Sequence, residues 1–161
     1  MKNWLKFLSI FFVCLALVLV VIIGWSAYSP FRSIESQAED AVIQNKQLKE
    51  VSESYVYNGT SSYVTVIGKD SKNKDKAIFV LQDQVNQKGP ALKMKNGISA
   101  EEAVEIAKKK DPNMKRVLHT KLGLEKPGAV WEITYKTKND KLNYVYITYT
   151  SGNWWKRITN L

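Results

Sequence analysis

The sequence contains very little cysteine and histidine. Of its 161 residues, only Cys14 and His119 belong to these two types. No disulfide can form within the chain, and no zinc site of the Cys/His type can be assembled. Cysteine–histidine catalysis is excluded as well, because Cys14 lies in a strongly apolar segment. A domain folded from this chain outside a cell must therefore be held together by packing alone.

Glycine is also scarce, and none of the 8 glycines forms a phosphate-binding loop of the GxGxxG or GxxxxGK[ST] type. A Ser-His-Asp triad would need His119, which has no nucleophile elbow nearby, so we interpret it as a sheet or surface residue. The pairs Glu39-Asp40 and Glu101-Glu102 fall in expected first helical turns, where acidic side chains stabilise the helix dipole. The sequence therefore predicts no enzyme, and no catalytic residue, cofactor site, metal site or small-molecule substrate.

Arginine is limited to three residues, Arg32, Arg116 and Arg157. Lysine supplies the rest of the 24 basic residues, which exceed the 15 acidic ones and give a formal net charge of +9. The lysines are scattered, which is typical of a solubilising surface and does not indicate a nucleic-acid partner. A basic surface can nevertheless attract anionic lipid or an anionic wall polymer. Electrostatic binding of such a polymer is therefore one functional hypothesis.

Charged residues are absent between Phe7 and Phe31. About 20 apolar residues, at roughly 1.5 Å each along a helix, cross a hydrocarbon core of about 30 Å. Lys2 and Lys6 precede the apolar run, so the positive-inside rule predicts a cytoplasmic N-terminus and an extracellular C-terminal domain. We expect residues 1–31 to form a cytoplasmic stub and a single-pass transmembrane anchor.

Two other interpretations of the apolar segment fit less well. A cleaved signal peptide needs a shorter apolar run and a small-x-small exit, whereas Ala27 has Trp25 two residues before it. A lipoprotein signal needs small residues before Cys14, where this chain has two bulky ones. Three aromatic residues suit the two membrane interfaces of an uncleaved anchor, namely Trp4, Trp25 and Tyr28.

A second helix is predicted after the membrane segment. Pro30 is expected to break the membrane helix, because proline lacks an N–H group and clashes with the preceding turn. An apolar stripe then indicates a helix over residues 34–48, with Ser36 and Glu39 as a capping box and Ser33 as an alternative start. Strand-like segments separated by turn residues follow, at residues 51–57, 62–68 and 76–82.

The same order of elements begins again after Gly89-Pro90. Ser99 and Glu102 form a second capping box, and Asp111-Pro112 ends the helix that it starts. Three further strands are predicted at residues 116–124, 129–137 and 142–149, and a short apolar patch at 154–158 ends the chain. A helix followed by three strands thus occurs twice, which suggests internal duplication.

The fold class predicted from this order is α+β. We expect an N-terminal transmembrane helix and then two tandem units, residues 32–89 and 90–161, each with one helix on a small antiparallel sheet. A unit of this size does not readily hold itself together, so the two units are expected to share an interface.

Aromatic residues are concentrated in the second unit. Side chains alternate along a strand, and one helix can fully cover only one face of a single sheet. Some aromatic side chains should therefore stay partly exposed and mark a contact surface, unless the other unit buries them. The predicted partner-binding residues are Trp131, Tyr135, Tyr144, Tyr146, Trp154 and Trp155.

Three segments of the second unit resemble a PepSY-type, cystatin-like domain. They are GISAEEAVEIAKKK in the helix, GAVWEITYK in the hairpin strand and YVYITYTSGNWWKRI at the end of the chain. An anchor followed by two such units resembles the YpmB or TseB-like family, membrane-anchored regulators of cell-wall elongation in low-GC Gram-positive bacteria. The resemblance implies a non-catalytic, extracytoplasmic interaction protein whose partner is a class B penicillin-binding protein.

One position departs from the PepSY pattern. Closing strands of that type usually carry an aspartate shortly before the T-x-G turn, and Thr148 stands there, although the turn itself is kept as Thr150, Ser151 and Gly152. The change weakens any expectation that this strand end binds a cation. A second function that the resemblance allows is inhibition or chaperoning of an extracellular peptidase.

Overall fold

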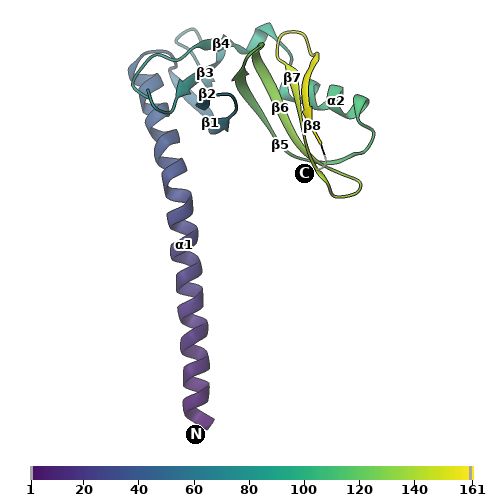
Figure 1. The fold of residues 1–161 in the computed structure, drawn as a ribbon. Helices are drawn as coiled ribbons and strands as arrows, with labels where there is room; N and C mark the ends of the chain where they lie inside the picture. Colours follow the sequence, from purple (N-terminus) through teal and green to yellow (C-terminus); the bar gives the residue numbers. More distant parts are fainter. Residues whose placement is uncertain (1, 160) are drawn as a thin grey trace.

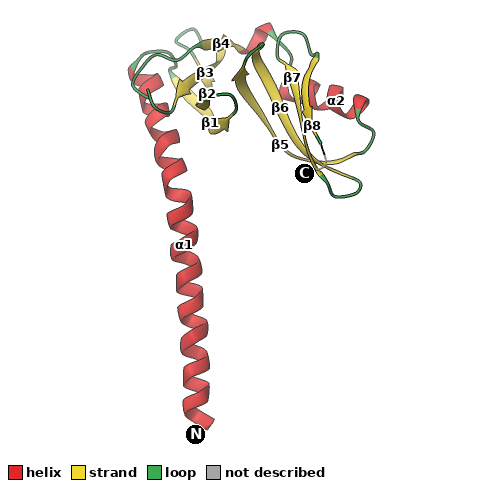
Figure 2. Cartoon of the chain, viewed as in Figure 1, coloured by secondary structure: helices red, strands yellow, loops and turns green. Residues whose placement is uncertain are grey.

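The protein consists of one long helix and two antiparallel four-stranded sheets (Figure 1). A computed structural model describes residues 2–159 and 161; the side chains of residues 2, 3 and 25–32 lie outside the description. The strands and the shorter helix follow the long helix in the chain (Figure 2). The α+β class, with an N-terminal apolar helix before two helix-covered sheets, is confirmed.

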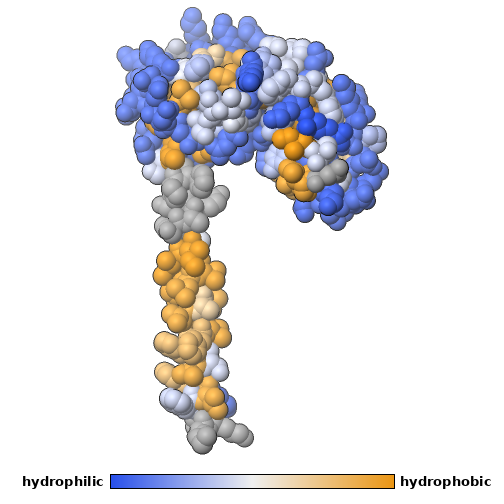
Figure 3. All heavy atoms as spheres, in the orientation of Figure 1, coloured by the Kyte–Doolittle hydropathy of each residue, from blue (hydrophilic) through white to orange (hydrophobic). Residues whose placement is uncertain are grey.

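Helix α1 runs without interruption from Lys2 to Gln44. Its segment Trp4–Gly24 is long and apolar enough to cross a membrane, and none of it is buried in the protein (Figure 3). The expected break at Pro30 is therefore wrong. Proline costs about 3 kcal/mol inside a helix, and helical turns on both sides of it, one of them packed on a sheet, offset that loss.

The C-terminal part of α1 packs on the first sheet. Ala38 and Val42 are buried against strand residues that include Val64, Val66 and Ile78. Because the helix has already begun at Lys2, the capping box expected at Ser36 and Glu39, the alternative start at Ser33 and the first-turn role of Glu39-Asp40 are wrong. Glu39 instead accepts a hydrogen bond from the hydroxyl of Ser54 on the first sheet.

The first sheet has the strand order β1-β2-β3-β4. Its first three strands closely match the predicted segments. β4 was not predicted, because three residues are too short for a periodic pattern, and it extends the first sheet beyond residue 89. The strands are β1 (Glu50–Asn58), β2 (Ser62–Lys69), β3 (Asp75–Leu81) and β4 (Ala91–Lys93).

A short 3-10 helix, η1 (Met94–Asn96), leads to helix α2 (Ala100–Lys110). Ser99 and Glu102 form the predicted capping box, with Glu102 N–H donating to Ser99 Oγ at 3.2 Å. The helix ends at Asp111, as predicted. Its buried residues, Ala103 and Ala107, turn toward the second sheet.

The second sheet has the order β5-β6-β7-β8 and carries α2 on one face (Figure 1). The apolar patch at the end of the chain is its fourth strand, and an irregularity in the pairing of β7 with β8 follows Tyr146. The strands are β5 (Met114–Glu125), β6 (Gly128–Thr137), β7 (Leu142–Thr148) and β8 (Trp154–Ile158).

The two sheets share an interface, as their small size predicts. Ala77 and Phe79, on the face of the first sheet that does not contact α1, belong to the same apolar core as Leu122 of β5. Leu122 N–H donates to the hydroxyl of Tyr55 at 2.7 Å, and the hydroxyl of Thr65 donates to Leu122 O at 2.9 Å. Side chains of the first sheet thus satisfy the backbone N–H and C=O groups of Leu122 at the open edge of β5. The sheets and α2 together are called the head below.

Candidate functional site

The second sheet has two aromatic faces with different environments. Trp131 pairs with Ile147 and Tyr135 with Asn143, so their side chains share the face that α2 covers. Trp131 is 4% exposed and donates from Nε1 to Ile98 O at 2.9 Å, while Tyr135 is fully buried. Trp154 packs against the same core. Three of the six predicted partner-binding residues therefore lie on the face that α2 covers, with Trp131 and Tyr135 buried and Trp154 partly exposed.

The other three lie on the opposite face of the sheet, which we call the aromatic face: Tyr144, Tyr146 and Trp155. Tyr144 is partly exposed, and Tyr146 lies under Trp155, with ring centroids 5.9 Å apart in an edge-to-face arrangement. Lys156 places its ammonium group 5.5 Å from the centroid of the Tyr146 ring. The pairing irregularity between β7 and β8 brings Trp155 onto this face.

A buried carboxylate, Glu132, lies on the aromatic face directly opposite Tyr146 in the β6–β7 pairing. Glu132 is 9% exposed. Burial of the Tyr146 side chain and, after it, the negative charge of Glu132 raise the pKa of the Tyr146 hydroxyl. The same carboxylate contributes to the raised pKa of Tyr57 at the junction of the sheets, after burial and the charge of Glu125. Glu132 and Tyr146 are therefore within electrostatic reach of Tyr57 at the junction.

The junction is closely fitted around Tyr57. Its ring lies against Gly123 of β5, where an added Cβ would come 2.1 Å from the Tyr57 Cζ atom. Its hydroxyl donates to Glu125 Oε1 at 3.0 Å, and Thr60 donates to the same carboxylate. Lys121 Nζ donates to Val56 O at 2.9 Å. These contacts fix the direction in which the aromatic face points.

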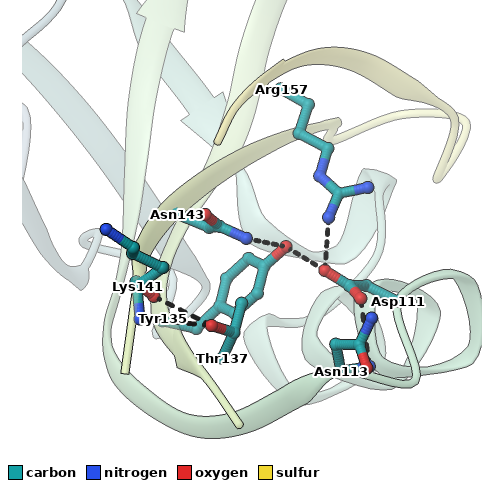
Figure 4. A network of polar contacts seen from close by, with 7 residues as sticks. All are labelled: Asp111, Asn113, Tyr135, Thr137, Lys141, Asn143 and Arg157. Atoms are coloured by element: carbon teal, nitrogen blue, oxygen red, sulfur yellow. Dashed lines mark hydrogen bonds and ion pairs between the residues drawn. The ribbon is translucent and has the colours of Figure 1, made fainter. Parts of the chain in front are cut away.

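A polar network occupies the far end of the second sheet (Figure 4). Asp111 is 4% exposed, forms an ion pair with Arg157 and accepts a hydrogen bond from the Tyr135 hydroxyl at 2.6 Å. Asn143 Nδ2 donates to that hydroxyl at 3.4 Å, and Asn113 N–H donates to Asp111 Oδ1 at 3.0 Å. The network joins the end of α2 to β6, β7 and β8. Because both oxygens of Asp111 are used internally, its role is to hold these elements together.

His119 is the one histidine, and its surroundings do not form a catalytic triad. Its Nε2 lies 2.8 Å from Thr134 Oγ1 and 3.6 Å from Glu132 Oε1. A triad needs the hydroxyl and the carboxylate on different ring nitrogens, whereas both approach the same nitrogen here. Among the described residues there is also no cluster of three or more His, Cys, Asp or Glu that could hold a metal ion.

Thr148, which stands where the PepSY pattern has aspartate, stabilises the following turn. Its Oγ1 lies 2.6 Å from Ser151 Oγ and accepts a hydrogen bond from Asn153 N–H at 3.1 Å. Gly152 has φ = +67°, a left-handed conformation that glycine adopts without strain. The polar groups of this strand end are therefore used within the turn.

The comparisons with known proteins agree with this architecture. Residues 37–80 match the model of a cell wall elongation regulator TseB-like domain, and residues 97–153 match the model of a peptidase propeptide and YPEB domain, PepSY. A solved structure, the YpmB protein from Bacillus subtilis, is similar with a TM-score of 0.64 and 27% sequence identity, over 76% of this chain and 95% of that chain. No curated protein matches the chain.

The two matched domains define a class of regulatory or inhibitor-like proteins. Their order, together with the structural similarity, supports the YpmB/TseB-like PepSY family for this chain. The six aromatic positions could be named from the sequence, but their division between a covered and an open face could not. The contribution of Glu132 to the aromatic face was missed, because a lone carboxylate in a strand gives no signal of burial.

Proposed function

We propose that this chain is a single-pass membrane protein with a cytoplasmic N-terminus and an extracellular head. The apolar span Trp4–Gly24 and the lysines on its N-terminal side support this topology. The division into residues 1–31, 32–89 and 90–161, and the origin of the two sheets by duplication, stay predictions.

We further propose that the head regulates cell-wall elongation by binding a protein in the same membrane, namely a class B penicillin-binding protein. The aromatic face is the observation that carries this proposal. Tyrosine and tryptophan provide large contact areas at low cost in conformational entropy and are enriched at protein interfaces. Trp131, Tyr135 and Trp154 pack behind the face and keep it rigid. Anchoring both proteins in one membrane raises their effective concentration.

A photo-crosslinking residue at Tyr144, in the full-length protein in its native membranes, tests this proposal. We expect it to capture a class B penicillin-binding protein. A second experiment places the crosslinker at Lys156. From this position, the double variant Tyr144→Ser/Trp155→Ser should give a crosslinking yield at least fivefold lower than that of the protein without these two substitutions. The matched control is Leu118→Ser, which removes another exposed apolar side chain, from β5, and should leave the yield unchanged. Recovery of no such protein from a folded head would reject the partner.

The PepSY match favours inhibition or chaperoning of an extracellular peptidase as a second function, because the matched model is described as a peptidase propeptide domain. In this case the purified protein should slow a peptidase secreted by the same cells at micromolar concentration. The Tyr144→Ser/Trp155→Ser variant should lose the effect if the same face is used. Unchanged peptidase rates with the unsubstituted protein would exclude this function.

A further inference from the structure

A hollow of about 540 Å³ opens on the first sheet, between the β2–β3 turn and the segment formed by β4 and η1. Two stretches of chain that are about 20 residues apart each bring several lysines to it. We call it the lysine pocket, after the five lysines that line it: Lys72, Lys74, Lys76, Lys93 and Lys95.

The turn beside the lysine pocket is held in one conformation by Asp70. The backbone N–H groups of Lys72 and Lys74 donate to Asp70 Oδ1 at 2.8 and 3.0 Å, and Lys76 Nζ lies 3.0 Å from Oδ2. These contacts, the hydrogen bonds first among them, lower the pKa of Asp70 to about 2. Asp70 is thus fully used in shaping the turn and in pairing with Lys76.

The other four lysines of the pocket outnumber its one remaining carboxylate, that of Asp75. None of the ion pairs between described residues involves Lys72, Lys74, Lys93 or Lys95. Moreover, Lys76 and Lys93 are directly opposite each other in the β3–β4 pairing. Like charges at such positions destabilise a sheet. Asp70 offsets the charge of Lys76, whereas no ion pair between described residues offsets that of Lys93. An anion would relieve this repulsion.

The lysine pocket lies at the end of the head that is remote from the membrane span. Lys49 N–H, just after α1, donates to Lys69 O at 2.7 Å, and Lys69 immediately precedes the turn. The end of α1 is about 20 residues beyond the apolar span, which is roughly 30 Å along a helix. Charges are screened over about 8 Å at physiological ionic strength. The headgroups of the chain's own membrane are therefore too far away to be the ligand.

We propose that the lysine pocket binds a linear phosphodiester polymer of the cell envelope. Exposed lysines hold a single small anion weakly, whereas a chain of phosphates can contact several of them at once and release its condensed counterions. The hollow offers such a chain ammonium groups from two strands and a turn. The identity of the polymer rests on the extracellular topology proposed above, but the site is separate from the aromatic face and does not depend on a protein partner.

Binding of soluble poly(glycerol phosphate) to the full-length protein, in nanodiscs of uncharged lipid, tests the proposal. The test variant changes Lys72, Lys74, Lys93 and Lys95 to glutamine. The control variant changes four other exposed lysines to glutamine, namely Lys88, Lys109, Lys126 and Lys138. Both variants lose the same charge, so only a localised site distinguishes them. We expect affinity to fall at least tenfold in the test variant and less than twofold in the control, with a shallower salt dependence only in the test variant.

Equal losses in the two variants would overturn the proposal, because they would mean that net charge alone attracts the polymer. Binding to anionic phosphatidylglycerol vesicles without binding to poly(glycerol phosphate) would overturn it in favour of lipid. Circular dichroism and a thermal midpoint equal to or above that of the unsubstituted protein exclude misfolding of the test variant. The Tyr144→Ser/Trp155→Ser variant should bind the polymer normally, which separates this site from the proposed protein-binding function.

Discussion

At the scale of single residues, the fixed direction of the head depends on a contact between Tyr57 and Gly123. Tyr57 is 1% exposed, and its hydroxyl is held by Glu125, so the ring cannot move aside. Glycine at position 123 is needed for close approach of the two sheets, since any Cβ would overlap the ring.

The substitution Gly123→Ala should therefore destabilise the head by about 1–3 kcal/mol, the usual range for overpacking a filled core. Thermal unfolding of the detergent-solubilised protein measures the effect. Gly24→Ala is the matched control, because a Cβ at Gly24 meets no atom within 4 Å. An unchanged thermal midpoint for Gly123→Ala would show that the two sheets can move apart at the junction without loss of stability.

Residue roles were predictable from the sequence where they depend on close neighbours in the chain. Ser99 and Glu102 are three residues apart, and their capping box forms as predicted. The alternation of Trp131 and Tyr135 predicted that they share a face, but the choice of that face depends on where α2 packs. Glu39 was misassigned for the same reason, because its partner Ser54 lies on another element.

At the scale of elements, helix α2 is the cover of the second sheet. It has 11 residues, which is too short for a stable helix in isolation. Its capping box and the packing of Ala103 and Ala107 on the second sheet must therefore supply the stability that the isolated helix lacks. The first turn of α2 also lies next to Ile98, whose carbonyl accepts the hydrogen bond from Trp131.

The substitution Ser99→Ala should therefore lower the free energy of unfolding by about 1 kcal/mol, the typical value for loss of an N-cap side chain. Chemical denaturation monitored by tryptophan fluorescence measures the change, since Trp131 reports on the covered face. Ser52→Ala, at an exposed position of β1, should have little effect. Equal stability of Ser99→Ala and the unsubstituted protein would mean that packing alone sets the start of α2.

Most elements could be predicted from periodicity and turn residues, and the errors concern tertiary context. The strands of both sheets were found because alternation and Asn-Gly or Pro-Gly turns are local signals. The break at Pro30 was not observed, because packing of Ala38 and Val42 on the first sheet continues the helix beyond it. β4 has three residues and no pattern of its own; only its pairing with β3 makes it a strand.

At the scale of the whole molecule, the buried tyrosine hydroxyls limit the stability of the folded protein at alkaline pH. Burial is the largest cause that raises the pKa of five of the eight tyrosines above the ordinary value of 10.0: Tyr55, Tyr57, Tyr135, Tyr146 and Tyr149. In the unfolded chain these phenols lose their protons near pH 10, whereas in the folded protein they keep them. The unfolded state then binds fewer protons, so stability falls as pH rises above about 10 and is not affected by these groups below it.

Tyrosinate absorbance and circular dichroism, recorded together during alkaline titration, test this expectation. The five phenols should ionise in a single step that coincides with the loss of circular dichroism. The Tyr57→Phe variant should show a smaller step in absorbance. Ionisation of all tyrosines while the circular dichroism is still native would contradict the assignment of burial as the cause.

In the proposed topology, the length of α1 beyond the apolar span sets the height of the head above the membrane. Seven alanines inserted between residues 26 and 27 would raise the head by about 10 Å and leave its rotational setting within about 20° of the original. If the head meets a partner anchored in the same membrane, the crosslinking yield from Tyr144 should fall several-fold. A flexible glycine-serine insertion of the same length should keep most of the crosslinking yield, because a flexible segment allows the head to reach its original height. Equal yields from the two insertions would argue against a fixed height.

The uninterrupted course of α1 has a mechanical consequence. In the proposed topology, the apolar span and the part of α1 beyond it have similar lengths, each about 30 Å. They form one continuous helix, and its C-terminal end packs in the core of the first sheet. A sideways force on the head would therefore tilt the membrane span, and this tilt would reach the opposite leaflet without any change in fold.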